Sequence, residues 1–377
     1  MKIGLNFHAV DGHISGVEYY ALRLLKSLLS VGARHSYVVY TNQPELVRGH
    51  VPASNNLTIV EVKHLGTRTA RILWEHTQLP RLAAKQAIDV LHCPSYICPV
   101  RKSSMPYVVT VHDTIAIDHP AWCKPTNALY FNLFMKGAIQ RASRVISVSK
   151  STANDMKRNF GLSDSKVRVV YPGIDEIFKA QEDPSRRDEI RKRYNLPPRY
   201  VLFVGNIEPK KNVGALLSLE SRLREKGLGH KLVMVGKRSW CSRSQLDQID
   251  KAVAASNIIV TGYVAVSDLP FVYAMADVFV FPSFYEGFGF PPLEAMACGT
   301  PVVSSSRGAL AESVADAAVV VEPDDTEQIV EAVLSMISDP ALRQEYVQKG
   351  LAQSRRFKWD NSARQTLSLY EEVCTAK

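Results

Sequence analysis

Short apolar runs alternate with longer helical patterns along the whole chain, and this alternation constrains the fold more than any other feature. In the first half the expected strands are Lys2–Phe7, Tyr37–Thr41, Leu57–Val62, Asp89–His92, Tyr107–Val111, Arg144–Val148 and Val167–Tyr171. In the second half they are Tyr200–Val204, Lys231–Val235, Ile258–Thr261, Val278–Phe281, Val302–Ser305 and Ala318–Val321. These runs are rich in Val and Ile and often lack alternation with polar residues, as expected of strands buried on both faces. The pattern predicts an α/β protein with βα repeats and parallel sheets.

The repeat is interrupted at residues 172–200, where prolines and charged residues gather. A length of 377 residues favours two domains over one. We therefore predict a first domain at residues 1–178 and a second at residues 200–356. The linker between them, 179–199, is expected to hold one short helix near residues 188–194.

The composition is that of a soluble globular protein, with 46% hydrophobic and 22% charged residues. No apolar run reaches the roughly 20 residues that span a bilayer. The first residues, MKIGLNFHAVDGH, lack the apolar core of a signal peptide, so we expect a first strand and a cytoplasmic protein. The cysteines show no CxxC spacing, so we expect reduced thiols rather than a zinc site.

The formal net charge is +9, and all of the excess lies in residues 1–178. It is explained either by solubility or by a basic face that meets an anionic surface or acceptor. The segment Arg68–Lys85 mixes basic residues with Leu73 and Trp74, as in a helix that lies on an anionic bilayer. We favour the alternative, a helix that packs on the core and is interrupted at Pro80. Nucleic acid is not an expected partner, because no recognised binding motif is present.

The stretch DVFVFPSFYEGFGFPPLEAMACGTPVVSS, residues 277–305, combines a buried strand, a glycine loop and a helix. The loop contains Glu286, and Pro291 and Pro292 open the helix, where proline is tolerated. Glu294 is expected in the first turn of that helix. A helix N-terminus attracts phosphate, and glycines let the backbone approach a ligand closely.

The two carboxylates beside this anion site suggest what the ligand contains. Glu286 can face a neutral group rich in hydroxyls, and Glu294 can accept hydrogen bonds from a diol such as ribose. A nucleotide-sugar offers both groups with a diphosphate between them. The alternative is that Glu294 complements the helix dipole and Glu286 is a solvated loop residue.

Two further motifs follow strands. VLFVGNIEPKKNVGALL places Lys210 and Lys211 in a loop before a helix, where two cations can stabilise a diphosphate leaving group. The alternative is a solvated basic turn. VVTVHDTI places His112 and Asp113 at the end of a strand, where ligands of parallel sheets bind, although a lone histidine is more often structural.

The two glutamates, eight residues apart within EGFGFPPLEAMACGTPVV, resemble the signature of the retaining glycosyltransferases of family 4. The resemblance covers nearly the whole chain and is strongest over residues 200–322. It implies the GT-B fold, with two Rossmann-like, doubly wound parallel-sheet domains facing each other across a cleft. It also implies that a C-terminal helix, 357–377, packs back on the first domain.

The resemblance assigns roles to individual residues. It implies that Lys211, with Lys210 beside it, contacts the donor phosphates, and that His112 reaches the donor sugar, with Asp113 orienting or packing near it. Many relatives have arginine where this chain has Asn206, so Lys210 is expected to replace that contact. The other donor-binding residues implied are Gly16, Tyr263, Val264, Gly287, Phe288, Gly289, Phe290 and Glu294. The usual pattern before the first helix has two glycines, and Ser15 replaces the first.

The resemblance implies a retaining hexosyltransferase, and we expect it to need neither metal nor cofactor, since no Asp-x-Asp motif ends a strand beside a histidine. The expected catalytic residues are His112 and Glu286. The expected donor is GDP-mannose, with UDP-sugars open, and the expected acceptor is a saccharide or lipid-linked saccharide in bacterial surface polysaccharide synthesis. Peripheral membrane contact through the basic half is a further expectation.

Two other functions are compatible with a Rossmann-like fold. A nicotinamide-dependent oxidoreductase would need a GxGxxG turn after an early strand, and neither GLNFHAVDG nor VGNIEPKKNVG supplies one. A catalytically silent nucleotide-sugar-binding subunit is the other, and the presence of Lys211, Glu286, Glu294 and His112 together argues against it.

Overall fold

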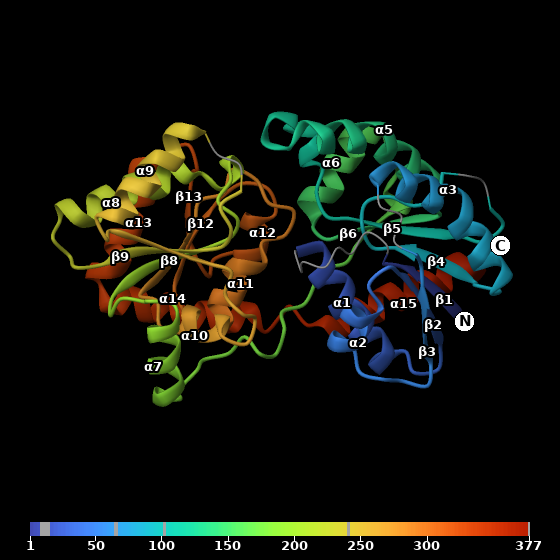
Figure 1. The fold of residues 1–377 in the computed structure, drawn as a ribbon, viewed down its shortest axis with the longest axis horizontal. Helices are drawn as coiled ribbons and strands as arrows, with labels where there is room; N and C mark the ends of the chain where they lie inside the picture. The colour runs from blue at the N-terminus through green and yellow to red at the C-terminus, as the bar shows by residue number, and fades with distance from the viewer. Residues whose placement is uncertain (8–15, 64–66, 101–102, 240–241, 376–377) are drawn as a thin grey trace. The chain divides into compact units, whose positions relative to one another are not determined.

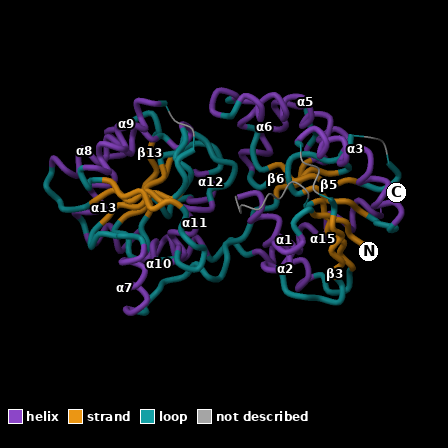
Figure 2. Tube along the Cα trace, in the orientation of Figure 1, coloured by secondary structure: helices purple, strands orange, loops and turns teal. Residues whose placement is uncertain are grey.

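The computed structural model describes residues 1–7, 16–63, 67–100, 103–239 and 242–375. The chain divides into two compact units, and each is built on its own sheet with helices on both faces (Figures 1 and 2). Unit 1 comprises Met1–Gly173 and Lys358–Lys377, and unit 2 comprises Ile174–Phe357.

The sheet of unit 1 is wholly parallel and has, in the described residues, the strand order β3-β2-β1-β4-β5-β6-β7. Its strands are β1 (Lys2–Asn6), β2 (Ser36–Thr41), β3 (Leu57–Glu61), β4 (Val90–Cys93), β5 (Tyr107–Val111), β6 (Arg144–Ser147) and β7 (Val167–Val169). β4 and β5 are buried at every position, which explains their apolar sequences. The order reverses between β1 and β4, so the connections leave the carboxyl edge in opposite directions at this point.

The helices of unit 1 are α1 (Gly16–Val31), α2 (Pro44–His50), α3 (Arg68–Lys85), α4 (Ile115–Asp118), α5 (Pro125–Arg141), α6 (Lys150–Phe160) and α15 (Trp359–Thr375). Short 3₁₀ turns occur at Pro120–Trp122 and Asp164–Lys166. α15, coloured red in Figure 1, packs beside α1, and the Trp359 ring meets the Tyr20 ring at 5.6 Å. The core of unit 1 is therefore completed by a helix from the far end of the chain.

The sheet of unit 2 repeats the plan with the order β10-β9-β8-β11-β12-β13 among the described residues. Its strands are β8 (Tyr200–Val204), β9 (Lys231–Val235), β10 (Ile258–Gly262), β11 (Val278–Phe281), β12 (Val302–Ser305) and β13 (Val319–Val321). All of these strands are parallel, and the order reverses between β8 and β11. Residues 205–212 and 282–289 leave the sheet at this reversal.

Helices cover both faces of this sheet. They are α7 (Pro184–Arg193), α8 (Val213–Glu225), α9 (Arg243–Ala254), α10 (Leu269–Ala274), α11 (Phe290–Ala297), α12 (Leu310–Val314), α13 (Thr326–Ser338) and α14 (Pro340–Ser354), with a 3₁₀ turn at Pro209–Lys211. α7 lies in the segment expected as a linker, and Arg186 and Arg193 at its two ends both pair with the buried Asp268 of unit 2.

The structure confirms the predicted fold class, with two Rossmann-like units and every expected strand present to within two residues. Three local expectations were wrong. α11 begins at Phe290, one residue before the proline pair, and α3 continues through Pro80 instead of stopping there. Gly16 is the first residue of α1 rather than part of the preceding loop. Within the described part of the chain, none of the helices has the length and apolar character needed to cross a bilayer.

Candidate active site

The carboxyl edge of unit 2 brings together the two loops that carry most of the predicted site residues. β8 and β11 are neighbours in the sheet, so the loop with Lys210 and Lys211 starts beside the loop with Glu286. The Phe284 amide donates a 2.8 Å hydrogen bond to the Lys210 carbonyl, which joins the two loops directly. Ligands of open α/β sheets bind at such a reversal of strand order.

Lys211 and Glu286 form a buried ion pair at this position. Lys211 Nζ donates to Glu286 Oε1 at 2.5 Å, and their side chains are only 10% and 13% exposed. Lys211 Nζ also lies 4.6 Å from the centre of the Phe281 ring, a cation–π contact at the end of β11. Lys210 Nζ lies 3.6 Å from Glu208 Oε1.

Burial and the mutual charge of Lys211 and Glu286 shift the pKa values of both groups. Burial lowers the pKa of Lys211, and the Glu286 carboxylate opposes that change. Burial raises the pKa of Glu286, but the charges of Lys211 and Lys210 outweigh it and hold that pKa below its ordinary value. Glu286 is therefore an ionised carboxylate at neutral pH, in a largely dry site.

The backbone of Glu286 is held by a second loop. The Ala309 amide donates to the Glu286 carbonyl at 2.9 Å, and Gly308 has a left-handed φ of +62°. A Cβ at Gly308 would lie 2.7 Å from the Glu286 carbonyl oxygen. Gly308 is thus a positioning residue that the sequence analysis missed, and the glycine in SSRGAL was its only signal.

The loop enters α11 through Gly289, which caps the helix with a φ of +96°. This left-handed φ favours glycine, and a Cβ at Gly289 would also lie 2.6 Å from Leu310 Cδ2 of α12, so that side chain would have to move. Gly287 precedes this cap, and the Phe288 ring packs edge-on against the Phe290 ring at 5.0 Å. Glycine thus allows α11 to begin at Phe290, ahead of the two prolines.

Glu294 is consequently the fifth residue of α11, in its second turn, and the expectation of a first-turn position was wrong. It is buried, and Tyr273 donates a hydrogen bond to its Oε2 at 2.9 Å. Burial raises the pKa of Glu294 to about 7, the Tyr273 hydrogen bond opposes the rise, and the charge of Asp175 adds to it. Asp175 ends the stretch VVYPGID, residues 169–175, and was not among the residues predicted for the site.

The structure places Tyr263 and Val264 after β10, two strands away from β8 in the sheet. Tyr263 is 62% exposed, whereas Val264 is buried. Neighbouring strands lie about 4.8 Å apart, so these residues are roughly 10 Å along the carboxyl edge from the Lys211 loop. They therefore lie on the same edge of unit 2 but outside the ion-pair cluster.

His112 lies in unit 1, directly after β5. Its Nε2 lies 2.7 Å from the Pro94 carbonyl oxygen, which can only accept, so Nε2 carries the proton. The ring is buried between Tyr20 at 4.8 Å and Tyr96 at 5.3 Å. Burial lowers the pKa of His112, although the Pro94 hydrogen bond and Asp113 oppose this, so Nδ1 of the neutral ring is a hydrogen-bond acceptor.

Asp113 and Gly16 complete the predicted residues of unit 1. Asp113 Oδ2 accepts from the Tyr96 hydroxyl at 2.9 Å, and its Oδ1 accepts from the Ile115 amide at 3.1 Å. A Cβ at Gly16 would meet nothing within 4 Å. Ser15 lies outside the described residues.

The described residues contain no cluster of three or more His, Cys, Asp or Glu side chains that could hold a metal ion. Cys93, Cys98, Cys123, Cys298 and Cys374 form no disulfide bond, and Cys241 is not among the residues described.

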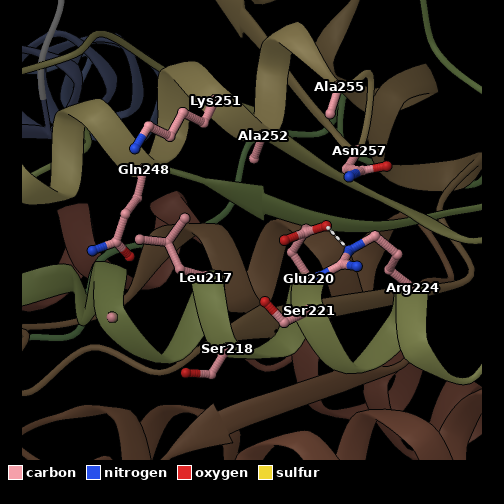
Figure 3. Close-up of a pocket in the computed structure, with 11 residues that line it drawn as sticks. Leu217, Ser218, Glu220, Ser221, Arg224, Gln248, Lys251, Ala252, Ala255 and Asn257 are labelled. Atoms are coloured by element: carbon pink, nitrogen blue, oxygen red, sulfur yellow. Dashed lines mark ion pairs between the residues drawn. The ribbon is translucent and has the colours of Figure 1, made fainter.

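A separate groove of about 500 Å³ runs between α8 and α9 on unit 2. Figure 3 shows Glu220 and Arg224 of α8 as an ion pair, which spans 3.5 Å, and Gln248 and Lys251 of α9 line the other side of the groove. None of the residues predicted for the site lines this groove, so it is distinct from the ion-pair cluster at the carboxyl edge.

Two family models match the chain, and together they span most of it. Residues 14–177 match "Glycosyltransferase Family 4", and residues 186–353 match "Glycosyl transferases group 1". Each match falls almost wholly within one of the two units.

Individual glycosyltransferases are also similar to this chain in sequence or in structure. O-antigen chain mannosyltransferase B of Escherichia coli is 30% identical over 98% of this chain and 100% of its own length. A serotype-specific mannosyltransferase of Escherichia coli is 28% identical over 72% of this chain and 34% of its own. The crystal structure of Anabaena HepE in complex with UDP-glucose superposes on this chain with a TM-score of 0.75 at 18% identity. The match covers 100% of each chain, so the two proteins share a fold. This chain therefore belongs to the family 4 glycosyltransferases and has their GT-B fold.

Proposed function

We propose that this glycosyltransferase is a retaining hexosyltransferase that moves mannose from GDP-mannose to a saccharide or lipid-linked saccharide during synthesis of a bacterial surface polysaccharide. The observation that carries the proposal is the buried Lys211–Glu286 ion pair where the strand order of unit 2 reverses. The choice of mannose and of polysaccharide rests on relatives that are named as mannosyltransferases, one of them of an O-antigen chain.

Unit 2 supplies the groups that a nucleoside diphosphate needs. Lys211 can donate to a phosphate oxygen while it remains paired with Glu286, because an ammonium group has three N–H donors. Pro291 and Pro292 have no N–H, so the first turn of α11 offers fewer amide donors than an ordinary helix N-terminus. The diphosphate is therefore held by Lys210, Lys211 and amides of the preceding loop together.

The remaining polar groups have distinct roles in this proposal. Glu294, once ionised, accepts hydrogen bonds from the ribose diol, and Tyr273 holds its carboxylate in place. Glu286 accepts a hydrogen bond from a hydroxyl of the transferred sugar. From unit 1, Nδ1 of His112 accepts another, since its Nε2 is committed to Pro94.

Transfer breaks the bond between the anomeric carbon and the diphosphate oxygen and forms a bond from the acceptor oxygen on the same face. The acceptor proton passes to the departing phosphate oxygen, so the products are GDP and a glycoside of unchanged anomeric configuration. Lys210 and Lys211 stabilise the negative charge that develops on the diphosphate. A UDP-sugar donor and a silent binding subunit are the rival functions.

Contact with an anionic membrane is part of the proposal for a lipid-linked acceptor. Unit 1 exposes Leu73 of α3 and Leu129 and Leu133, one turn apart on α5, each more than 60% exposed. The surplus positive charge lies in the same part of the sequence. Sedimentation with phosphatidylglycerol vesicles tests this, and equal binding to neutral phosphatidylcholine vesicles would count against it.

The deciding experiment combines binding with product analysis. GDP should raise the melting temperature more than UDP or ADP, since a ligand that binds only the folded state stabilises it. Proton NMR of the product from GDP-mannose and a mannoside acceptor should show an α-linkage. Stabilisation by UDP alone would mean that the donor is a UDP-sugar and not GDP-mannose. A β-linked product would refute the retaining mechanism. Nucleotide binding without turnover would favour the silent binding subunit.

A further inference from the structure

We propose that Glu75 of unit 1 binds a hydroxyl group of the acceptor saccharide, in a polar subsite formed with Asn6 and Arg71. The proposal rests on the proposed function, because it concerns the second substrate of that reaction. Glu75, Asn6 and Arg71 belong neither to the sequence motifs described above nor to the proposed donor site.

The position of Glu75 is the first argument. It lies in the second turn of α3, and its Oε1 accepts a 3.3 Å hydrogen bond from Nδ2 of Asn6, the last residue of β1. The strand order of unit 1 reverses between β1 and β4, so Asn6 and Glu75 lie at the point where ligands of such sheets bind. Lys211 and Glu286 occupy the corresponding position in unit 2.

The incomplete pairing of Glu75 and Arg71 is the second argument. Glu75 and Asn6 are 4% and 2% exposed, and the 3.3 Å contact is the one hydrogen bond of Glu75 within the described chain. One helical turn earlier, Nε of Arg71 is buried with no hydrogen-bond partner in the structure described. Burial raises the pKa of Glu75, and the Arg71 charge opposes the rise. Buried polar groups normally find partners, so the Glu75 carboxyl group and Nε of Arg71 are available to a ligand.

The chemistry of the subsite selects the ligand. A carboxylate accepts hydrogen bonds, whereas the guanidinium of Arg71 donates them, and neighbouring sugar hydroxyls do both. A phosphate would be repelled by Glu75. A divalent cation would be repelled by Arg71 and would find no cluster of three metal-binding side chains among the described residues. A neutral polyhydroxylated ligand fits this set of groups.

The distance to His112 fits a second sugar. β4 separates β1 from β5, so Asn6 and the start of the His112 loop are roughly 10 Å apart along the carboxyl edge. A saccharide that contacts Glu75 would therefore lie about two strand spacings from the sugar that His112 is proposed to contact. The acceptor thus lies over β1 and the donor sugar over β5.

The test uses the full chain with GDP-mannose as donor and octyl α-mannoside as acceptor. Glu75→Gln preserves the size of the side chain and an oxygen for Asn6, but removes the charge. It should raise the acceptor KM about tenfold or more, because hydrogen bonds to charged groups are the stronger ones. The Kd for GDP should stay within about twofold and the melting temperature should not fall. Gln78→Ala, on the exposed side of the same helix, is the matched control and should change nothing.

Arg71→Gln provides an independent variant if Glu75→Gln does not fold, and it should also raise the acceptor KM without changing GDP affinity. An unchanged acceptor KM in both variants overturns the proposal. Parallel losses of GDP affinity, acceptor affinity and melting temperature would assign Glu75 a structural role and also overturn it. Wild-type protein that binds GDP but transfers to no mannoside refutes the acceptor class, whereas wild type that neither binds nor releases GDP refutes the proposed function itself.

Discussion

Lys211 Nζ and Glu286 Oε1 lie 2.5 Å apart, although 75 residues separate them in the sequence. They meet because β8 and β11 are adjacent in the sheet and each residue follows the carboxyl end of its strand. Both side chains are nearly buried, so each charge depends on the other for compensation.

Breaking this pair from one side should cost stability as well as activity. Glu286→Gln and Lys211→Met should each lower the free energy of unfolding by about 3 kcal/mol, since each leaves one buried charge without its partner. The double variant should be more stable than the sum of the single losses predicts, yet remain inactive. Urea unfolding and GDP release measure the two effects. Fully additive stability losses would show that the pair is not coupled.

Gly308→Ala should reduce turnover through Glu286. The new Cβ would lie 2.7 Å from the Glu286 carbonyl oxygen, so the loop must shift. Gly299→Ala is the matched control, because Gly299 also has a positive φ but has open space where its Cβ would lie. Both variants bear the strain of a left-handed alanine, about 1 kcal/mol. Only Gly308→Ala should lower kcat. Equal kcat losses in Gly308→Ala and Gly299→Ala would show that Gly308 does not position Glu286.

Glu294 should make unit 2 less stable as the pH rises. Its folded pKa of about 7 lies above its ordinary value of 4.5, so the folded state holds this proton more tightly than the unfolded state. The stabilisation is complete below pH 4.5 and is lost as the pH rises to about 7, a change of about 3 kcal/mol. Glu294→Gln should abolish this part of the pH dependence in urea unfolding at pH 5 and pH 8. Identical slopes in both proteins would refute the assignment.

His92 should give unit 1 the opposite dependence. Its Nδ1 contacts the Tyr370 hydroxyl at 2.5 Å and its Nε2 contacts Thr110 Oγ1 at 2.8 Å, inside the core. Burial lowers the pKa of His92 to about 3, so the folded state resists protonation that the unfolded state accepts below pH 6.5. Stability should fall as the pH drops from 6.5 towards 3, by up to about 5 kcal/mol from this residue. Hydrogen exchange of β4 amides in wild type and His92→Gln measures it, and equal acid sensitivity would contradict it.

The strands could be predicted from the sequence because a strand buried on both faces must be apolar throughout, as Tyr107–Val111 illustrates. The course of α3 could not. Pro80 suggested a break, but Leu79 and Ala83 on either side of it are buried in the core, and this packing holds the helix together across the proline. Tertiary contacts therefore override the local preference.

The site was predicted residue by residue but not as an arrangement. Lys211 and Glu286 were each expected beside the donor, whereas their contact depends on strand order, which hydrophobic runs do not reveal. Glu294 was placed one residue too early in its helix because the conformation of Gly289 cannot be read from its neighbours. Glu75 gave no signal, since a single acidic residue in an amphipathic helix is usually solvated.

The place of α15 has a consequence for biosynthesis. Residues 174–357, which form unit 2, are continuous in the chain, whereas unit 1 needs both Met1–Gly173 and the later helix with Trp359 and Tyr370. During translation, unit 1 therefore cannot complete its fold until α15 has been synthesised. All of unit 2 is synthesised before that helix. Nascent unit 1 would meanwhile expose the apolar surface that α15 covers, which makes it the natural client of a chaperone during translation.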